Sequence, residues 1–282
     1  MRAPATEPGM YASPRNSSAV LSTERSGDKS YIVRNEIVRD LTEEEFDLLQ
    51  PHLELMSFGQ GEIIQQIDAP IDHVYFVESG IVSLLVRNAV DAPVEITPVY
   101  PSGMIGLEVM ANAAKAIYRA AVQVPETSVL RLPTRELQRA LEQRPAIIRV
   151  LRDYAQLQMR SSAQNLLCQA KHSIEPRLAK WLALASDQYT DGLIPIKQDD
   201  LAISLGVRRP SISWAVKRLV SRGLVERRRG AVQIRDMAGL QTQACSCVSA
   251  LRRFHTKPAG RAHNVHILAG LRADGGEQNL GA

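Results

Sequence analysis

The stretch from Ile194 to Ile234 limits what this chain can fold into more than any other part of the sequence. Leu201 and Leu205 lie one helical turn apart and predict the buried side of a short helix. Gly206 follows where the chain must turn sharply, because glycine tolerates the positive φ that such turns often need. A second helix is indicated by its apolar stripe, which consists of Ile212, Ala215, Val216 and Leu219.

Two short runs of alternating apolar residues follow this helix pair after Gly223. The runs are Leu224 to Arg227 and Val232 to Ile234, and they flank an Arg-Arg-Gly-Ala turn at residues 228–231. Alternating runs joined by a short glycine-containing turn predict a two-stranded hairpin. We interpret the whole stretch as a helix–turn–helix with a basic wing, a combination that points to DNA.

Charge is concentrated in the same stretch. The chain carries a net charge of +4, but the segment from Lys197 to Arg235 alone carries +7, which leaves −3 for the remainder. Clustered cations favour phosphate binding, because each neutralised phosphate releases condensed counterions. The charge distribution therefore indicates double-stranded DNA as a partner.

Length and composition limit the class of protein. A chain of 282 residues suggests two domains, and 45% hydrophobic residues are enough to build cores. Three cysteines are too few and too unevenly placed for the disulfide framework of a secreted protein. No apolar run reaches the roughly 18 residues that a membrane span needs, and residues 1–30 lack a signal peptide's apolar core. We expect a cytoplasmic protein without a membrane partner.

The chain in order predicts a β-rich domain between helical segments. Residues 1–30 are rich in Ser, Pro, Arg and Gly and are expected to be a disordered leader. Glu36 to Leu49 has helical spacing, and Thr42 with Glu45 forms a capping box. Residues 31–133 then hold seven or eight short β-branched runs separated by turns. Such runs predict a small antiparallel barrel of the jelly-roll type, which can enclose one small ligand.

Residues 134–172 are expected to form a helical connector with a long dimerisation helix that Pro145 opens. Residues 173–247 complete the DNA-binding domain, and residues 248–282 have no period and are expected to be a disordered tail. A heptad pattern indicates the seam of the long helix, although its second half is polar. The seam consists of Ile147, Leu151, Tyr154, Gln158, Ser161, Asn165 and Cys168.

The order of barrel, long helix and winged helix–turn–helix resembles the Crp–Fnr superfamily of bacterial transcription regulators. The resemblance covers about residues 35–247, and its most specific segments are Pro70 to Val86, Ile174 to Gln188 and Asp199 to Ile234. It implies an α+β fold, with an N-terminal antiparallel jelly-roll-like β-barrel, a long dimerisation helix and a C-terminal winged helix-turn-helix. It also implies a homodimer on a two-fold symmetric operator, RNA polymerase as a partner, and no enzymatic activity.

We expect the second helix to enter the major groove of DNA by its N-terminal end, and this docking predicts which residues contact the DNA. Arg209 is the best candidate for reading a guanine edge. Trp214 either packs against a thymine methyl group or closes the helix pair. The predicted base-reading residues are Arg209, Pro210, Ser211 and Trp214, and the predicted backbone contacts are Arg208, Ser213, Lys217, Arg218, Arg227, Arg228 and Arg229.

The barrel departs from the cyclic-nucleotide pattern of the superfamily. The matching places read Gly106-Leu107-Glu108 and Tyr118-Arg119, so the ribose-binding carboxylate and the serine after the arginine are missing or displaced. Gly106, Glu108, Tyr118 and Arg119 are therefore a candidate effector pocket for an unidentified small molecule. We expect no binding of cyclic AMP at physiological affinity.

Metal and catalytic signals are weak. Cys168 and His172 are four apart on a helix and could share a metal with a dimer partner, but a buried thiol and a helix-end histidine are the commoner pair. Cys245 and Cys247 lack a second pair to complete a site. The cysteine-free first 60 residues argue against an iron–sulfur oxygen sensor. We therefore expect no metal and no cofactor.

Two other functions stay open beside a regulated transcription factor. One is a constitutive, ligand-free DNA-binding protein whose barrel is only a dimer scaffold. The other is a barrel enzyme fused to a DNA-binding domain, against which the absence of a catalytic motif argues.

Overall fold

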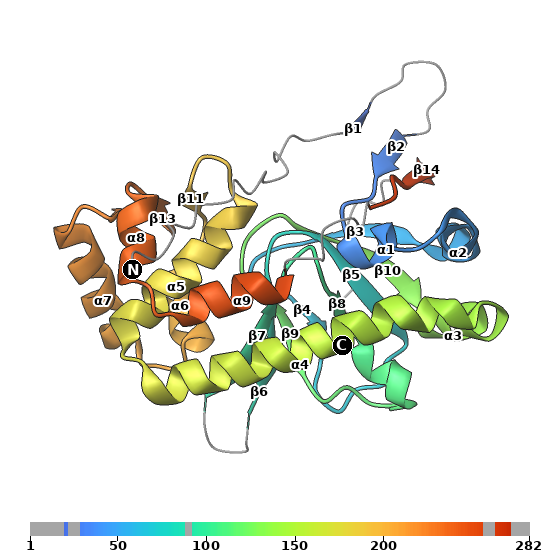
Figure 1. The fold of residues 1–282 in the computed structure, drawn as a ribbon, viewed down its shortest axis with the longest axis horizontal. Helices are drawn as coiled ribbons and strands as arrows, with labels where there is room; N and C mark the ends of the chain where they lie inside the picture. The colour runs from blue at the N-terminus through green and yellow to red at the C-terminus, as the bar shows by residue number, and fades with distance from the viewer. Residues whose placement is uncertain (1–19, 22–28, 88–91, 256–262, 272–282) are drawn as a thin grey trace, which may run out of the picture.

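A computed structural model describes residues 20–21, 29–87, 92–255 and 263–271. A β-rich N-terminal part and a helical C-terminal part lie along one long helix, α4 (Ile148–Lys171), which spans most of the molecule in Figure 1. This is the α+β architecture that the sequence predicts. The expected long helix begins as Pro145 suggested, with a 3₁₀ turn at Pro145–Ile147.

The N-terminal part is a jelly roll of two four-stranded antiparallel sheets, with strand orders β3-β10-β5-β8 and β4-β9-β6-β7. Apolar side chains of both sheets, among them Val77, Leu84 and Val129, pack together between them. The two sheets hold eight strands, in agreement with the seven or eight predicted runs. The strands are β3 (Glu54–Phe58), β4 (Ile63–Gln65), β5 (His73–Ser79), β6 (Val82–Val86), β7 (Val94–Val99), β8 (Met104–Ile105), β9 (Arg119–Val122) and β10 (Thr127–Pro133).

Short helices α1 (Glu36–Arg39) and α2 (Glu43–Leu49) precede the jelly roll. The predicted capping box is confirmed, since Thr42 and Glu45 each accept a backbone N–H of the other. The buried Glu78 carboxylate of β5 accepts the backbone N–H groups of Arg34 at 2.6 Å and Asn35 at 3.1 Å. Burial raises the pKa of Glu78 to about 7, against these hydrogen bonds.

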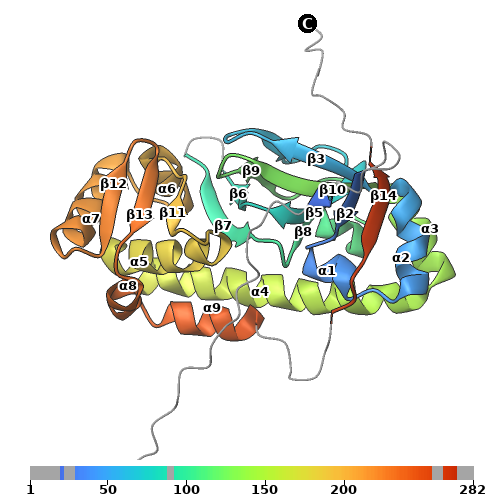
Figure 2. The ribbon, with the colours of Figure 1, turned by 90° about the horizontal axis from the view of Figure 1, so that it is seen from above.

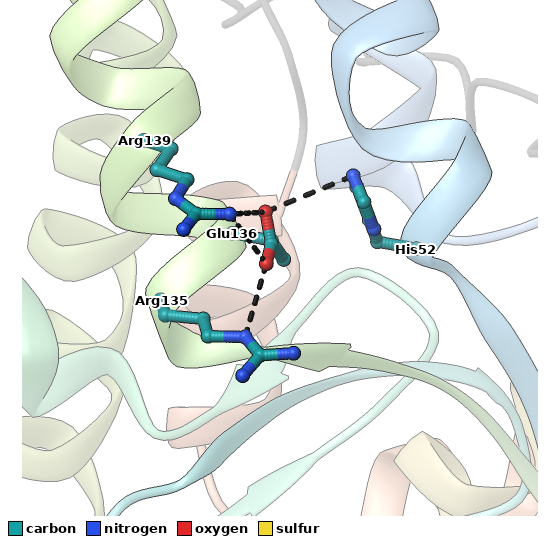
Figure 3. Close-up of polar contacts among 4 residues, drawn as sticks. All are labelled: His52, Arg135, Glu136 and Arg139. Carbon is teal, nitrogen blue, oxygen red and sulfur yellow. Dashed lines mark hydrogen bonds and ion pairs between the residues drawn. The ribbon is translucent and has the colours of Figure 1, made fainter.

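Helix α3 (Thr134–Gln143) follows β10 and carries a cluster of charged side chains (Figure 3). Glu136 receives hydrogen bonds from Arg135 at 3.0 Å and Arg139 at 3.1 Å, and lies 3.7 Å from His52. Burial opposes ionisation of this carboxyl, but the hydrogen bonds and charges of its neighbours outweigh it and lower the pKa of Glu136. The cluster joins α3 to the segment that leads into β3.

The predicted heptad seam of α4 faces the chain's own jelly roll and is not available to a partner. Leu151, Tyr154, Ser161 and Asn165 are buried. Tyr154 donates its hydroxyl to the carbonyl of Met104 at 3.2 Å. The seam prediction was wrong because Tyr154 and Asn165 donate hydrogen bonds to the barrel of the same chain.

The C-terminal domain has the predicted winged helix–turn–helix. A single apolar cluster joins its helices to its small sheet, in which β13 pairs with both β11 and β12. Lys197 occupies the N-cap of α6 with no side-chain cap hydrogen bond. The elements are α5 (Ile174–Ala185), β11 (Leu193–Ile194), α6 (Gln198–Ser204), α7 (Arg209–Ser221), β12 (Val225–Arg228), β13 (Ala231–Ile234) and α8 (Met237–Gln243).

The expected disordered tail at 248–282 is wrong for two of its segments. Residues Cys247–His255 form α9, which packs on α4, and Ile267–Leu271 form β14, which pairs with β2 (Lys29–Ile32) (Figure 2). The ring of His266 stacks on Phe46 of α2, with 4.1 Å between centroids. Of the expected leader, β1 (Val20–Leu21) and the start of β2 are described. Residues 1–19, 22–28, 256–262 and 272–282 of the two segments lie outside the described residues.

Among the described residues, no helix is both long and apolar enough to cross a membrane.

Candidate DNA-binding surface and effector region

The turn between α6 and α7 places the N-terminal end of α7 at the surface. Gly206 adopts a φ of 59°, in the left-handed region that its position was expected to require. Arg208 is the N-cap and Pro210 lies in the first turn, where proline's missing N–H costs no helical hydrogen bond. The apolar stripe is confirmed, since all four of its residues are buried: Ile212, Ala215, Val216 and Leu219.

Arg209 is exposed at the first position of α7. Its guanidinium forms an ion pair with Asp199 of α6 at 3.3 Å, and both side chains are more than 60% exposed. Surface ion pairs of this kind contribute only about 0–1 kcal/mol, so Arg209 can exchange Asp199 for a base edge at little cost. Pro210 is exposed beside it and Ser211 is half-buried.

Trp214 lies on the outer face of α7 with 53% of its surface exposed. The Arg218 guanidinium lies 5.7 Å from the centre of its ring. Because buried residues other than Trp214 close the helix pair, its second predicted role is wrong, and its first, packing against a thymine methyl group, stays a prediction. An exposed aromatic ring beside a cation suits a DNA surface.

Not every predicted backbone contact is equally available. The Ser213 hydroxyl donates to Gln198 Oε1 at 2.8 Å and so joins α7 to α6. Arg218 lies 3.4 Å from Glu175, which also pairs with Arg222 at 2.8 Å. Lys217 is exposed.

The wing carries three consecutive exposed arginines, Arg227, Arg228 and Arg229, before Gly230. Gly230 adopts a φ of 69° in the hairpin turn. Arg228 pairs with Glu226 at 2.9 Å, and Arg235 donates a hydrogen bond that lowers the pKa of this carboxyl. The wing and α7 thus present most of the predicted cations on the surface of one domain.

The candidate effector residues come together at one end of β9. Gly106, with a φ of 87°, precedes the 3₁₀ turn Leu107–Ala111 that holds Glu108. Glu108 Oε1 accepts the backbone N–H of Ile117 at 3.2 Å, next to Tyr118, whose pKa is raised by burial and by the Glu108 charge. Arg119 Nε is buried without a hydrogen-bond partner among the described residues. Gln65 Nε2, on the neighbouring strand β4, is a second buried donor without a partner in the part of the chain that the structure describes.

A cavity of about 850 Å³ lies between the barrel, α4 and α5. Glu95 of β7, Lys180 of α5 and Ser204 of α6 line it. Glu95 accepts a hydrogen bond from Ser83, and Lys180 donates to Asn165 of α4 at 3.0 Å. These contacts form a polar joint between the barrel and the DNA-binding domain.

Titration of Glu95 is expected to make stability depend on pH. Burial raises the pKa of Glu95 to about 7, against the hydrogen bonds of Ser83 and Ser204 and the Lys180 charge. A raised folded-state pKa means that its stabilising effect is present at low pH and is lost as the pH rises through about 7. Between about pH 5.5 and pH 8 the Glu95 contribution falls by about 2 kcal/mol.

Urea unfolding at about pH 5.5 and pH 8 tests whether titration of Glu95 causes this loss of stability. The Glu95→Gln chain is expected to lose less stability than wild type over this interval, while Glu142→Gln, an exposed control, behaves like wild type. An unchanged pH dependence in Glu95→Gln contradicts the assignment, although Glu78 keeps part of the effect in every chain.

Comparisons with known proteins agree with this geometry. Residues 176–243 match the profile of the Crp-like helix-turn-helix domain, and residues 55–144 match that of the cyclic nucleotide-binding domain. Together the two ranges cover more than half of the chain. No curated protein sequence matches it.

Solved structures with the same fold include three bacterial proteins. FixK2 from Bradyrhizobium japonicum is 19% identical, with a TM-score of 0.60, over 69% of this chain and 98% of that one. TTHB099, a CRP-family transcriptional regulator from Thermus thermophilus, is 20% identical, with a TM-score of 0.57, over 67% and 96%. The c-di-GMP-responsive global regulator CLP from Xanthomonas campestris is 14% identical, with a TM-score of 0.57, over 68% and 99%. Identities this low support the fold alone.

Proposed function

The chain belongs to the Crp–Fnr superfamily of transcription regulators, and we propose that it binds a two-fold symmetric operator sequence-specifically as a homodimer. The observation that carries the proposal is the joint exposure of the N-terminal end of α7 and the arginine wing on one domain. A recognition helix that enters the major groove needs an exposed N-terminal end for bases and flanking cations for phosphates.

The proposed dimer interface is the free face of α4. Its exposed residues recur at spacings of 4-3-4-3-4, which is the heptad pattern of a coiled-coil seam. This face is distinct from the predicted seam, which is buried against the barrel. Met159 is 74% exposed and Leu166 is 70% exposed, although both are large and apolar. The face consists of Arg152, Gln156, Met159, Ala163, Leu166 and Ala170.

We propose that the regulator responds to a signal at the barrel and that the signal is not cyclic AMP. Glu108 is engaged by the backbone of Ile117, and Arg119 offers a positively charged, unpartnered buried donor for an anion among the described residues. The neighbour CLP responds to c-di-GMP, so the fold accommodates other signals in that protein. Isothermal titration that showed micromolar, saturable binding of cyclic AMP would overturn this part.

The mechanism that we propose is a population shift. The signal alters how the barrel packs on α4, and the polar joint around Glu95 and Lys180 transmits the change to the DNA-binding domain. Both recognition helices then engage half-sites about 34 Å apart only in one of the two states. Such a regulator would act in the bacterial cytoplasm with RNA polymerase as its partner.

Salt dependence separates a specific regulator from a constitutive, ligand-free DNA-binding protein with the barrel as scaffold. Replacement of Arg227, Arg228 and Arg229 by alanine is expected to weaken binding to all DNA sequences about equally and to reduce the slope of log K against log salt by about 3 per wing. Filter-binding titrations at several salt concentrations measure the affinity and its salt slope.

The matched control is Arg253→Ala, which removes an exposed arginine of α9 outside the proposed surface. It is expected to leave the slope unchanged. A wing variant with the wild-type slope would remove the wing from the interface, and wild-type binding without sequence preference would favour the constitutive alternative.

A further inference from the structure

All three cysteines of the chain meet one histidine at a single place. Cys168 and His172 lie at the C-terminal end of α4, and Cys245 and Cys247 lie at the junction between α8 and α9. The four candidate ligand atoms all lie within 4.8 Å of one another. The sequence analysis expected no metal because it treated the two pairs separately, whereas the structure brings both pairs of one chain together.

The spacing of these atoms fits one tetrahedral ion. Cys168 Sγ lies 3.5 Å from Cys245 Sγ, and Cys247 Sγ lies 3.5 Å from His172 Nδ1. Zinc–sulfur bonds of about 2.3 Å and zinc–nitrogen bonds of about 2.0 Å, at tetrahedral angles, separate neighbouring ligand atoms by roughly 3.5–3.8 Å. Ligands of an iron–sulfur cluster bind more than one iron atom, so a set drawn together this closely favours a single ion.

The surroundings suit a site that carries negative charge. The three thiols are buried, with 1%, 7% and 1% of Cys168, Cys245 and Cys247 exposed. Gln164 donates a hydrogen bond to Cys247 Sγ at 3.1 Å, as outer-shell groups commonly do for ligands. A divalent ion with three thiolates and a neutral imidazole has a net charge of about −1.

Two buried cations lie next to the cluster. Arg177 and Lys180 are 8% and 7% exposed, and each interacts electrostatically with Cys168. The side chain of Arg177 donates to the carbonyl of Leu205, a neutral acceptor. Lys180 also faces the Glu95 carboxyl, whereas Arg177 is beside the cysteines. Because a buried cation is costly without an opposing charge, a negatively charged metal–thiolate centre accounts for Arg177 at this place.

The structure assigns a mononuclear zinc site to Cys168, His172, Cys245 and Cys247. Three sulfur ligands and one imidazole form a closed tetrahedral set of the kind found in structural zinc sites. The three thiols release their protons as the ion binds. No position is left for a substrate or water, so the ion has a structural role.

The site joins two parts of the chain that the sequence separates by 77 residues. It fixes the end of α4, just before α5 begins the DNA-binding domain, to the segment that leads into α9. Metal binding here restrains the connection between the long helix and the DNA-binding domain. The binding free energy of such a site adds to the stability of the fold.

Metal analysis of the full chain, purified without chelator, tests the assignment. We expect about one zinc ion per wild-type chain and almost none in Cys168→Ser or Cys247→Ser. His172→Cys, which keeps four ligands, is expected to retain zinc, whereas His172→Ala loses most of it. The matched controls Ser249→Ala and Lys171→Ala change exposed neighbours of the ligands and are expected to retain it fully.

Chelation of the wild-type chain gives a second readout that does not depend on whether the variants fold. A strong chelator is expected to lower the melting temperature, and added zinc to restore it. Cobalt(II) in place of zinc is expected to show the visible absorption of tetrahedral thiolate coordination. A metal-free wild-type chain, zinc retained in Cys168→Ser, a native disulfide in this cluster, or iron with inorganic sulfide would each overturn the assignment.

Discussion

A Leu166→Glu chain is expected to be monomeric and to bind its operator at least about 100-fold more weakly than wild type. Leu166 lies on the free face of α4 with Met159 two helical turns before it, and both side chains are mostly exposed. A carboxylate at this place would lie unpaired in the seam between two long helices. A monomer then contacts one half-site, and the gain from binding two linked half-sites is lost.

Sedimentation equilibrium and gel-shift titration of the same preparation measure the two effects. The matched control is Val265→Glu, which places the same charge at an apolar side chain that is 70% exposed but does not belong to α4. The control is expected to stay dimeric. If Leu166→Glu sediments as a dimer with wild-type affinity, the free face of α4 is not the interface.

An Arg209→Ala chain is expected to lose about 1–3 kcal/mol of discrimination between the operator and the same site with one guanine changed. Arg209 stands at the first position of α7, and its only ion pair among the described residues is the exposed one with Asp199. Its removal leaves the phosphate contacts of the wing in place, so non-specific affinity changes much less than selectivity.

Competition titrations with matched and mutated duplexes check this prediction, with Arg253→Ala as the charge-matched control. Arg209→Lys is expected to keep part of the affinity but little of the selectivity, because lysine lacks the planar pair of donors. Binding by Arg209→Ala that is as selective as wild type would assign base reading to another residue.

Local chemistry made much of the fold predictable. The capping box of Thr42 and Glu45, the turn at Gly206 and the apolar stripe of α7 each depend on residues a few positions apart. Such local signals specify a helix or a turn independently of how the rest of the chain folds. The winged helix–turn–helix, which is built from them, was therefore predicted in detail.

The face of α4 that we propose for dimerisation could not be predicted in the same way, because the helix carries two heptad patterns. The predicted seam contains Tyr154 and Asn165, which donate to the carbonyls of Met104 and Ile96. Only the position of the barrel decides that these polar groups are satisfied within the chain. The other face, with Met159 and Leu166, then remains exposed.

Contacts between segments far apart in the sequence could not be predicted either. The pairing of β14 with β2 and the meeting of Cys168 with Cys245 join residues far apart in the sequence, and each half alone is too weak a pattern to indicate a partner. A Cys-x-Cys pair needs a second pair before it indicates a metal. That second pair became visible only when α9 was found to pack on α4.

Selection of binding sites from a pool of random duplex DNA tests the central claim most directly, because it requires no knowledge of the operator. The wild-type chain is expected to enrich a two-fold symmetric sequence whose half-sites are centred about 10 base pairs, or one helical turn, apart. Leu166→Glu should enrich at most a single half-site. A wild-type chain that binds the pool tightly but enriches no sequence, or enriches one without two-fold symmetry, would contradict the proposal of a homodimeric, sequence-specific regulator.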